Sequence, residues 1–197
     1  SIVDRTEYVL DQTSDSDQEI YSKIGAKLTL HDLLYRMIIR SSNLATNLVI
    51  EVLGAENVNE TMRRMGARDI QVRRGVEDTK AFQKGLNNTT TAKDLMIIFE
   101  SIASGNAVSA KASEEMIKIL LDQQFNTIIP AQLPSGVKVA HKTGSITGVF
   151  HDSGIVILPD GRKYVLVLLS KDVEDEKAAV NAMAKVSALI YQYVVKG

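Results

Sequence analysis

The amino-acid sequence predicts an α+β fold, in which a mostly helical part precedes an antiparallel sheet and a closing helix. Three observations support this prediction. Hydrophobic residues recur at helical spacing in several segments between residues 29 and 123, strand-like runs begin at Val137, and helical spacing returns from Glu174. Helices and strands that are grouped in this way, rather than alternating, are typical of α+β layering.

Composition limits the function classes. The chain has 197 residues, 45% of them hydrophobic and 24% charged, which suits one domain or two interleaved subdomains. The net charge is −1 and like charges form no long run, so we expect no nucleic-acid partner. No apolar stretch approaches ~18–20 residues, which predicts no membrane span. The chain contains no cysteine, which excludes disulfides and thiolate metal sites, and we expect no metal or cofactor.

Helix-capping signals mark the ends of several predicted helices in the N-terminal part of the chain. Residues 1–28 are polar, and we interpret them as an extended lead-in with at most one short strand. Thr29-x-x-Asp32 is a capping box that begins a helix ending near Arg40. Two further helices, over about 44–53 and 56–65, end at Gly54 and Gly66.

A long loop and two more helices complete the predicted helical subdomain, residues 29–136. Residues 67–90 form the loop, and loops of that length are usually functional or disordered. Thr91-x-x-Asp94 caps a helix that ends at Gly105, and residues 113–123 form an amphipathic helix.

The third predicted region, residues 137–197, contains the sheet. Strands are expected over 137–145, 153–158 and 163–170, with Pro159-Asp160-Gly161 as a hairpin turn. A long C-terminal helix follows. Its core-facing residues are expected to be Ala179, Met183, Val186, Ile190 and Val194.

Two short motifs contain residues that could take part in substrate binding or catalysis. Ser41-Ser42-Asn43 lies at the junction of two helices, and its residues are typical helix caps. His141-Lys142-Thr143-Gly144-Ser145 lies on the first predicted strand. There Lys142, Thr143 and Ser145 are suited to bind a substrate carboxylate, Gly144 would admit a ligand close to the backbone, and the Ser145 N–H is a candidate oxyanion donor.

The loop acids and the histidines have simpler interpretations. Glu77 and Asp78 are the two acids of residues 70–90; most loop acids are merely solvated, but either is a candidate general base. His31 is expected in a first helical turn. His141 and His151 lack metal-ligand spacing, so we expect structural hydrogen bonds for both, with Asp152 paired to a neighbour.

These motifs, in this order, belong to the motif set of serine β-lactamases and penicillin-binding proteins. Met37–Asn47 resembles the class A β-lactamase helix that carries Ser-x-Asn, and Leu133–Gly144 is similar to the approach to the Lys-Thr-Gly strand of that family. Arg74–Asp78, with Gly85–Ala92, resembles an omega loop of a class A-like branch, and His151–Gly154 is similar to that branch as well. The resemblance covers nearly the whole chain.

The resemblance implies a β-lactamase/transpeptidase-like fold with a five-stranded antiparallel sheet, and acylation of a serine without metal. It implies catalytic roles for Ser41 as proton relay, for Glu77 and for Lys142, and substrate binding by Asn43, Thr143, Gly144 and Ser145. Two features depart from the family pattern. The nucleophilic Ser-x-x-Lys is absent, because Ser135–Lys138 reads as a loop entering a strand, and Glu77 lacks the usual Glu-x-x-Leu-Asn context.

We therefore predict a class A-like serine β-lactamase whose N-terminal strands, first helix and nucleophile lie outside this chain, so that the chain alone is inactive. The expected ligands are a β-lactam or a D-Ala-D-Ala-like peptide, and the missing N-terminal segment is an expected partner. The expected location is periplasmic or secreted. Two alternatives stay open: a D,D-peptidase-like penicillin-binding hydrolase, and a non-catalytic binding module that keeps the pocket.

Overall fold

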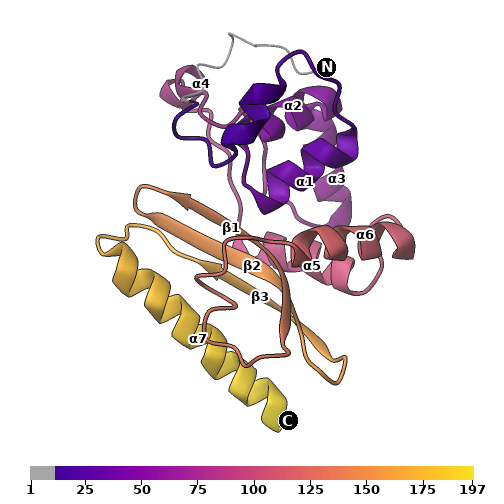
Figure 1. Cartoon of the computed structure of the whole chain (residues 1–197), viewed down its shortest axis with the longest axis vertical. Coiled ribbons are helices and arrows are strands. Elements are labelled where there is room, and N and C mark those ends of the chain that lie inside the picture. The colour runs from indigo at the N-terminus through magenta and orange to yellow at the C-terminus, as the bar shows by residue number, and fades with distance from the viewer. Residues whose placement is uncertain (1–11) are drawn as a thin grey trace. The chain divides into compact units, whose positions relative to one another are not determined.

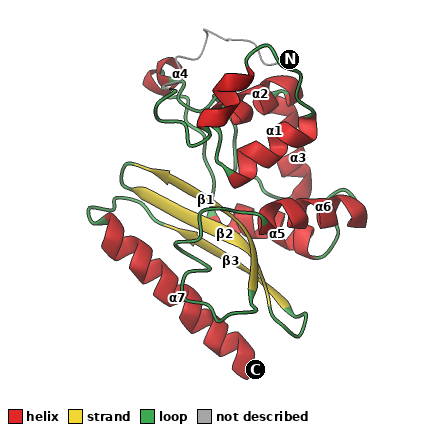
Figure 2. Cartoon of the chain, viewed as in Figure 1, coloured by secondary structure: helices red, strands yellow, loops and turns green. Residues whose placement is uncertain are grey.

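The computed structural model describes residues 12–197, which form two compact units divided between Asp94 and Leu95. Figure 2 shows that the three named strands belong to the second unit and that the first is built from helices and loops. Part of the predicted lead-in, residues 1–11, lies outside the described residues. Residues 12–28 contain a 3-10 helix, η1 (Gln18–Lys23), where at most a short strand was expected.

The first unit is organised by α1 (Leu30–Ile39), α2 (Asn43–Leu53) and α3 (Ala55–Met65). Thr29 and Asp32 form the predicted capping box, with the Thr29 side chain accepting from the Asp32 N–H and the Asp32 carboxylate accepting from the Thr29 N–H. Apolar side chains of η1, α1 and α2 bury one another. The buried members of this core are Ile20, Leu33, Leu44, Ala45, Leu48 and Val49.

The predicted loop 67–90 is partly ordered into regular structure. It contains the five-residue helix α4 (Thr79–Gln83) and a β-bridge between Gln71 and Thr89. The sequence prediction missed α4 because a helix of little more than one turn has no apolar periodicity to detect. The bridge brings the two ends of the loop together, so the segment that carries Glu77 is held at both sides.

Helix α5 (Ala92–Ala103), whose first turn belongs to the first unit, and α6 (Ala110–Leu121) precede the sheet of the second unit. The side chain of Thr91 accepts from the Asp94 N–H, as its predicted capping role requires. The prediction for α6 was wrong at its start: the helix begins at Ala110, three residues before the expected Ser113, because the Ser109 hydroxyl accepts from the Ala112 N–H and caps it.

The sheet has the order β1-β2-β3 and is antiparallel throughout. Its strands are β1 (Lys138–Ile146), β2 (Val149–Ile157) and β3 (Lys163–Leu169). The Pro159-Asp160-Gly161 turn joins β2 to β3 as predicted, whereas β2 begins four residues before its predicted start at Ser153. The resemblance implied five strands, and the described residues contribute three. This arrangement confirms the predicted fold class.

Helix α7 (Glu176–Lys196) packs on the sheet. Val180, Met183 and Ile190 lie against the core formed by the sheet and residues 128–129, and Ser187 is buried among them. The prediction that Val186 faces this core was wrong, since that side chain is 41% exposed. By length and composition alone α7 is the one described helix that satisfies the criteria for a membrane span, contrary to the sequence expectation; here its apolar face packs on the sheet.

Candidate active site

The Ser-x-Asn motif occupies the start of α2. Ser42 caps the helix, because its buried hydroxyl accepts from the Ala45 N–H at 3.2 Å. Ser41 therefore does not serve as the cap, and its backbone has a positive φ of 51°. A non-glycine residue in this conformation costs free energy that surrounding structure must offset, and such residues cluster at functional sites. Asn43 is the first residue of the helix, and its side chain is directed to the loop acid described next.

Glu77 receives two hydrogen bonds on one carboxylate oxygen. Asn43 Nδ2 donates to Glu77 Oε1 at 2.9 Å, and Ser14 Oγ donates to the same oxygen at 2.7 Å. Glu77 Oε2 is buried and has no partner within residues 12–197. The residue itself has a positive φ of 63°. The structure thus joins two of the predicted site residues, Asn43 and Glu77, and leaves one carboxylate oxygen available for a small polar ligand such as water.

Asp78 has a different role from its neighbour. Its carboxylate accepts from the Ala81 N–H at 2.9 Å and caps α4. This geometry separates the two acids that the sequence left as alternatives, because a capping carboxylate is engaged by the helix backbone. Glu77 is the member of the pair that contacts the Ser-x-Asn motif.

Three asparagine side chains hold the loop ahead of Glu77. Asn47 forms a pair of hydrogen bonds with the backbone of Val76, donating to its carbonyl at 3.0 Å and accepting from its N–H at 2.7 Å. Asn59 pairs in the same way with Val72. Asn88 accepts from the N–H groups of residues 73 and 74. The loop backbone is therefore satisfied by side-chain amides in place of a strand partner.

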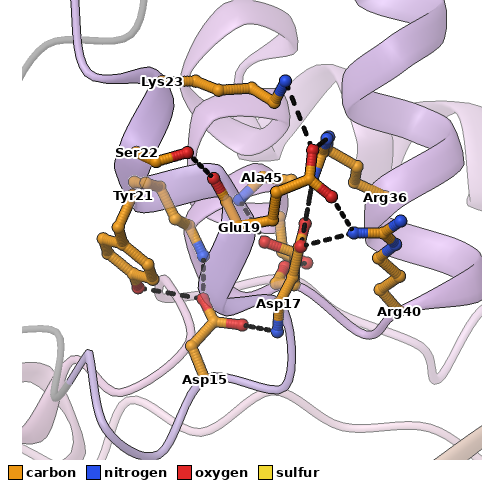
Figure 3. A network of polar contacts seen from close by, with 12 residues as sticks. Asp15, Asp17, Glu19, Tyr21, Ser22, Lys23, Arg36, Arg40 and Ala45 are labelled. Atoms are coloured by element: carbon orange, nitrogen blue, oxygen red, sulfur yellow. Dashed lines mark hydrogen bonds and ion pairs between the residues drawn. The ribbon is translucent and has the colours of Figure 1, made fainter.

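A buried ionic network fixes the segment that carries Ser14. Asp17 is fully buried and contacts Arg36 at 2.7 Å and Arg40 at 3.1 Å (Figure 3). Both arginines also contact Glu19, and their hydrogen bonds, that of Arg40 foremost, lower the pKa of Glu19 to about 2. The arginines lie on α1 and at its end, so the network ties η1 to the helix that leads into Ser41.

Asp15, next to Ser14, extends this network into α2. It accepts from the Tyr21 hydroxyl at 2.9 Å (Figure 3). It also accepts from the Leu44 N–H at 3.1 Å. Burial, together with the nearby Asp15 carboxylate, raises the pKa of Tyr21 far above its usual range. Sequence reasoning missed Ser14 and Asp15, because nothing in a polar turn indicates which distant residues its side chains will contact.

The Lys-Thr-Gly motif lies on β1 in the second unit. Lys142 is half-buried, and burial lowers the pKa of its ammonium group to about 8, with Asp152 acting in the opposite direction. Its Nζ donates to the Thr143 carbonyl at 2.6 Å. Gly144 and Ser145 are exposed. At Gly144 an added Cβ would meet only the His151 Cβ, at 4.0 Å, so the protein's own packing does not require glycine there.

His141, one residue before Lys142, forms the structural contacts that were expected. Its Nδ1 lies 2.8 Å from Asp152 Oδ1, and both side chains are fully buried. This confirms the expected pairing of Asp152. His31 lies in the first turn of α1, as predicted. Ser135 lies in a turn before β1, which supports its rejection as the nucleophile, since that serine is expected at a helix N-terminus.

The comparison with protein families identifies the chain. The model of the family described as "Beta-lactamase enzyme family" matches residues 4–194. The chain belongs to this β-lactamase family. Among its relatives are a β-lactamase of Bacteroides uniformis, 24% identical over 83% of this chain, and the extended-spectrum β-lactamase PER-1 of Pseudomonas aeruginosa, 25% identical over 99% of it. These alignments cover 60% and 66% of the two relatives, so the chain spans less than two thirds of their length.

Solved structures agree with this membership. A β-lactamase from Sphaerobacter thermophilus has a TM-score of 0.78 and 30% identity, covering 84% of this chain and 63% of its own. The protein PBP-A has a TM-score of 0.81 and 29% identity, covering 90% of this chain and 65% of its own. A variant of PBP-A was solved as an acyl-enzyme complex with penicillin G. The solved structures similar to this chain therefore include both a protein named a β-lactamase and a protein whose variant was solved as an acyl-enzyme with penicillin G.

Proposed function

We propose that the full-length protein is a class A-like serine β-lactamase, which hydrolyses the β-lactam amide through an acyl-enzyme. The observation that supports this most directly is the Glu77 carboxylate, which contacts Asn43 of the Ser-x-Asn motif and keeps one buried oxygen without a partner in residues 12–197. A water on that oxygen would be activated to attack the acyl ester. Membership of the β-lactamase family supports the same reaction.

Each motif residue has a separate role in the proposed reaction. A serine oxygen attacks the β-lactam carbonyl, the C–N bond breaks, and the nitrogen leaves with a proton delivered through Ser41. Asn43 binds an amide carbonyl of the substrate. Lys142, with the Thr143 and Ser145 hydroxyls, binds the carboxylate, and the Ser145 N–H stabilises the oxyanion. Gly144 admits the ligand close to the strand, a role that is consistent with the absence of any packing need for glycine there.

We place the nucleophilic serine and its lysine outside these 197 residues. The single Ser-x-x-Lys of the chain, Ser135–Lys138, lies in the turn that enters β1. The relatives contain additional sequence beyond the matched part, and we propose that the corresponding N-terminal segment supplies the nucleophile. We also propose export to the periplasm or the medium, where β-lactams and cell-wall peptides occur.

A specific observation favours a second function, that of a D,D-peptidase-like penicillin-binding hydrolase. Two donors, Asn43 Nδ2 and Ser14 Oγ, already occupy Glu77 Oε1, so that oxygen is less accessible to an attacking water. PBP-A, at 29% identity, is as similar to this chain as the β-lactamases are. A protein that acylates but deacylates slowly would bind penicillin rather than destroy it.

The lifetime of the acyl-enzyme distinguishes the two functions. Full-length protein is mixed with a penicillin, and the intact mass is followed over time. A β-lactamase forms the adduct and clears it quickly, while Glu77→Gln traps it and Asp78→Asn, the control at the α4 cap, does not. A wild-type adduct that persists for hours supports the penicillin-binding function instead, and no adduct at any time in either wild type or Glu77→Gln contradicts both.

A further inference from the structure

The buried ring of His141 has an oxygen acceptor at each of its two nitrogens. Nδ1 lies 2.8 Å from Asp152 Oδ1, and Nε2 lies 3.1 Å from Asn126 Oδ1. The orientation of the Asn126 amide is fixed, because its nitrogen donates to the Gln123 carbonyl at 3.1 Å and leaves the oxygen facing the ring. An acceptor opposite each nitrogen is satisfied only if both nitrogens have protons.

We propose that His141 donates a hydrogen bond from each ring nitrogen, to Asp152 and to Asn126, so that both nitrogens have protons, and that it acts as a positioning residue for Lys142 and Thr143. The ring is the cation of a buried ion pair with Asp152, one position before the Lys-Thr-Gly motif in β1. The positioning role rests on the proposed function, whereas the protonation state is a property of the fold alone.

The pair is anchored to three other parts of the second unit. Asp152 Oδ2 accepts from the Ile129 N–H at 2.9 Å, and the Ile129 carbonyl accepts from the Ser187 hydroxyl of α7 at 2.8 Å. Gln123 Nε2 donates to the His141 carbonyl at 3.3 Å. Because all of these groups are buried, a shift of β1 would break several hydrogen bonds at once.

The opposite strand, β2, approaches the backbone and Cβ of His141 very closely. Gly154 pairs with His141 in the β1–β2 register. A Cβ at Gly154 would lie 2.5 Å from the His141 Cβ and 2.4 Å from the Ala140 carbonyl oxygen, closer than atoms can approach. The glycine therefore allows His141 and the neighbouring strand to pack at this distance, which makes the His141–Asp152 pair a built feature of the sheet.

The charge of the ring also affects Lys142. The charged groups that line the pair are Asp152 on β2 and Lys142 on β1, whereas Gln123, Asn126 and Ser187 contribute neutral dipoles. A protonated His141 neutralises Asp152, so that the positive charge of Lys142 is left for a ligand. A neutral ring would leave Asp152 as an unbalanced buried anion, whose nearest cation would be Lys142.

Nuclear magnetic resonance of the ¹⁵N-labelled full-length protein tests the protonation state without substrate. We expect both ring nitrogens of His141 to show a directly bonded proton at pH 7, with the signals lost in His141→Gln and retained in His151→Gln. A ring with one unprotonated nitrogen would overturn the proposal. The protonation state is measured on the wild-type protein and the variants serve only to assign its signals, so the result does not depend on whether the protein hydrolyses β-lactams.

Acylation by a penicillin tests the positioning role. His141→Gln is expected to slow acylation about tenfold, the size of one lost hydrogen bond, with its thermal unfolding still cooperative. His151→Gln, the matched control on β2, should acylate at the wild-type rate. Wild-type acylation by His141→Gln would refute the positioning role. If wild-type protein forms no adduct, the proposed function and the positioning role both fail, while the resonance data still decide the protonation state.

Discussion

The two groups of proposed site residues are held by different physical means. Glu77 lies in a loop and has a positive φ. The Asn43 amide and the Ser14 hydroxyl donate to its carboxylate, and the Asn47 amide holds the preceding residue, Val76. Lys142 stands on a regular strand that is backed by the buried His141–Asp152 ion pair. The loop residue depends on many small contacts, and the strand residue depends on tight packing and one charged pair.

This difference leads to distinct sensitivities. Loss of one amide in the loop removes one or two hydrogen bonds and should loosen the backbone gradually. An extra side-chain atom on β2 where it faces β1 would collide with backbone that cannot move aside, so a single substitution there should cause a large loss of stability. The four predictions that follow, ordered from the largest expected effect to the smallest, are chosen to break or sharpen this contrast.

The largest effect is expected at Ser41. Ser41→Ala in the full-length protein should slow acylation on the order of 10²–10⁴-fold, because it removes the proposed proton relay to the leaving nitrogen. The rate of acyl-enzyme formation measures this. Ser42→Ala is the matched control: it removes the α2 cap, lowers the free energy of unfolding by about 0.5–2 kcal/mol and leaves the relay in place. Equal acylation rates in Ser41→Ala and wild type would exclude Ser41 from the reaction.

The steric limit of the sheet is tested at two glycines, Gly154 on β2 and Gly144 on β1. Gly154→Ala should lower the free energy of unfolding by about 2–3 kcal/mol, because its Cβ would lie 2.4 Å from the Ala140 carbonyl oxygen. Urea unfolding checks this. Gly144→Ala, whose Cβ would meet only the His151 Cβ at 4.0 Å, should unfold like wild type and yet acylate more slowly. Equal stability of the two variants would refute the tight packing behind β1.

The hydrogen bonds of the loop are tested at Asn47. Asn47→Ala should cost about 1–2 kcal/mol, because it leaves the Val76 N–H and carbonyl without partners. Hydrogen exchange at the Val76 amide should become faster, and deacylation should slow in parallel. Asn57→Ala is a suitable control, since exposed Asn57 donates only to the Leu53 carbonyl of its own helical region. Unchanged exchange at Val76 would show that the loop is held by other contacts.

A smaller, graded effect is expected from pH. Burial lowers the pKa of Lys142 to about 8, so the cation that binds a substrate carboxylate is present below that pH and is lost above it. Acylation by a carboxylate-bearing β-lactam should therefore fall by half near pH 8 and about tenfold per further pH unit. Lys142→Arg keeps its charge and should move this alkaline limb upward. A flat profile to pH 10 would remove Lys142 from carboxylate binding.

The same contrast explains what the sequence could predict. The helices α1 to α3 and the β2–β3 hairpin were found because the Thr29–Asp32 capping box, Gly54, Gly66 and the Pro159–Gly161 turn mark their ends locally. The start of β2 was missed because buried Asp152 interrupts the apolar pattern, and its burial is made tolerable by two distant partners, His141 and the Ile129 N–H. Helices and strands whose ends have local sequence signals can be predicted from the sequence, whereas those stabilised by residues distant in the chain cannot.

The candidate site shows the same limit. Asn43, Glu77 and Lys142 were nominated from motifs, and the structure joins the first two directly. Ser14 and Asn126 were missed, because their roles depend on residues 63 and 15 positions away in the chain. The choice between Glu77 and Asp78 could not be made from sequence, since both acids lie in the same loop and only the α4 cap separates them.

The most direct test of the account separates the two chemical steps in the full-length protein. Acylation and deacylation rates for one penicillin are measured by rapid mixing and mass spectrometry in wild type, Lys142→Ala and Glu77→Gln. Lys142→Ala should slow acylation about 10–100-fold, as expected for a lost charge-assisted hydrogen bond, and leave deacylation nearly unchanged. Glu77→Gln should do the reverse, slowing deacylation by 10²-fold or more. If both variants slow the same step to the same extent, the assignment of the strand to acylation and the loop to deacylation is wrong.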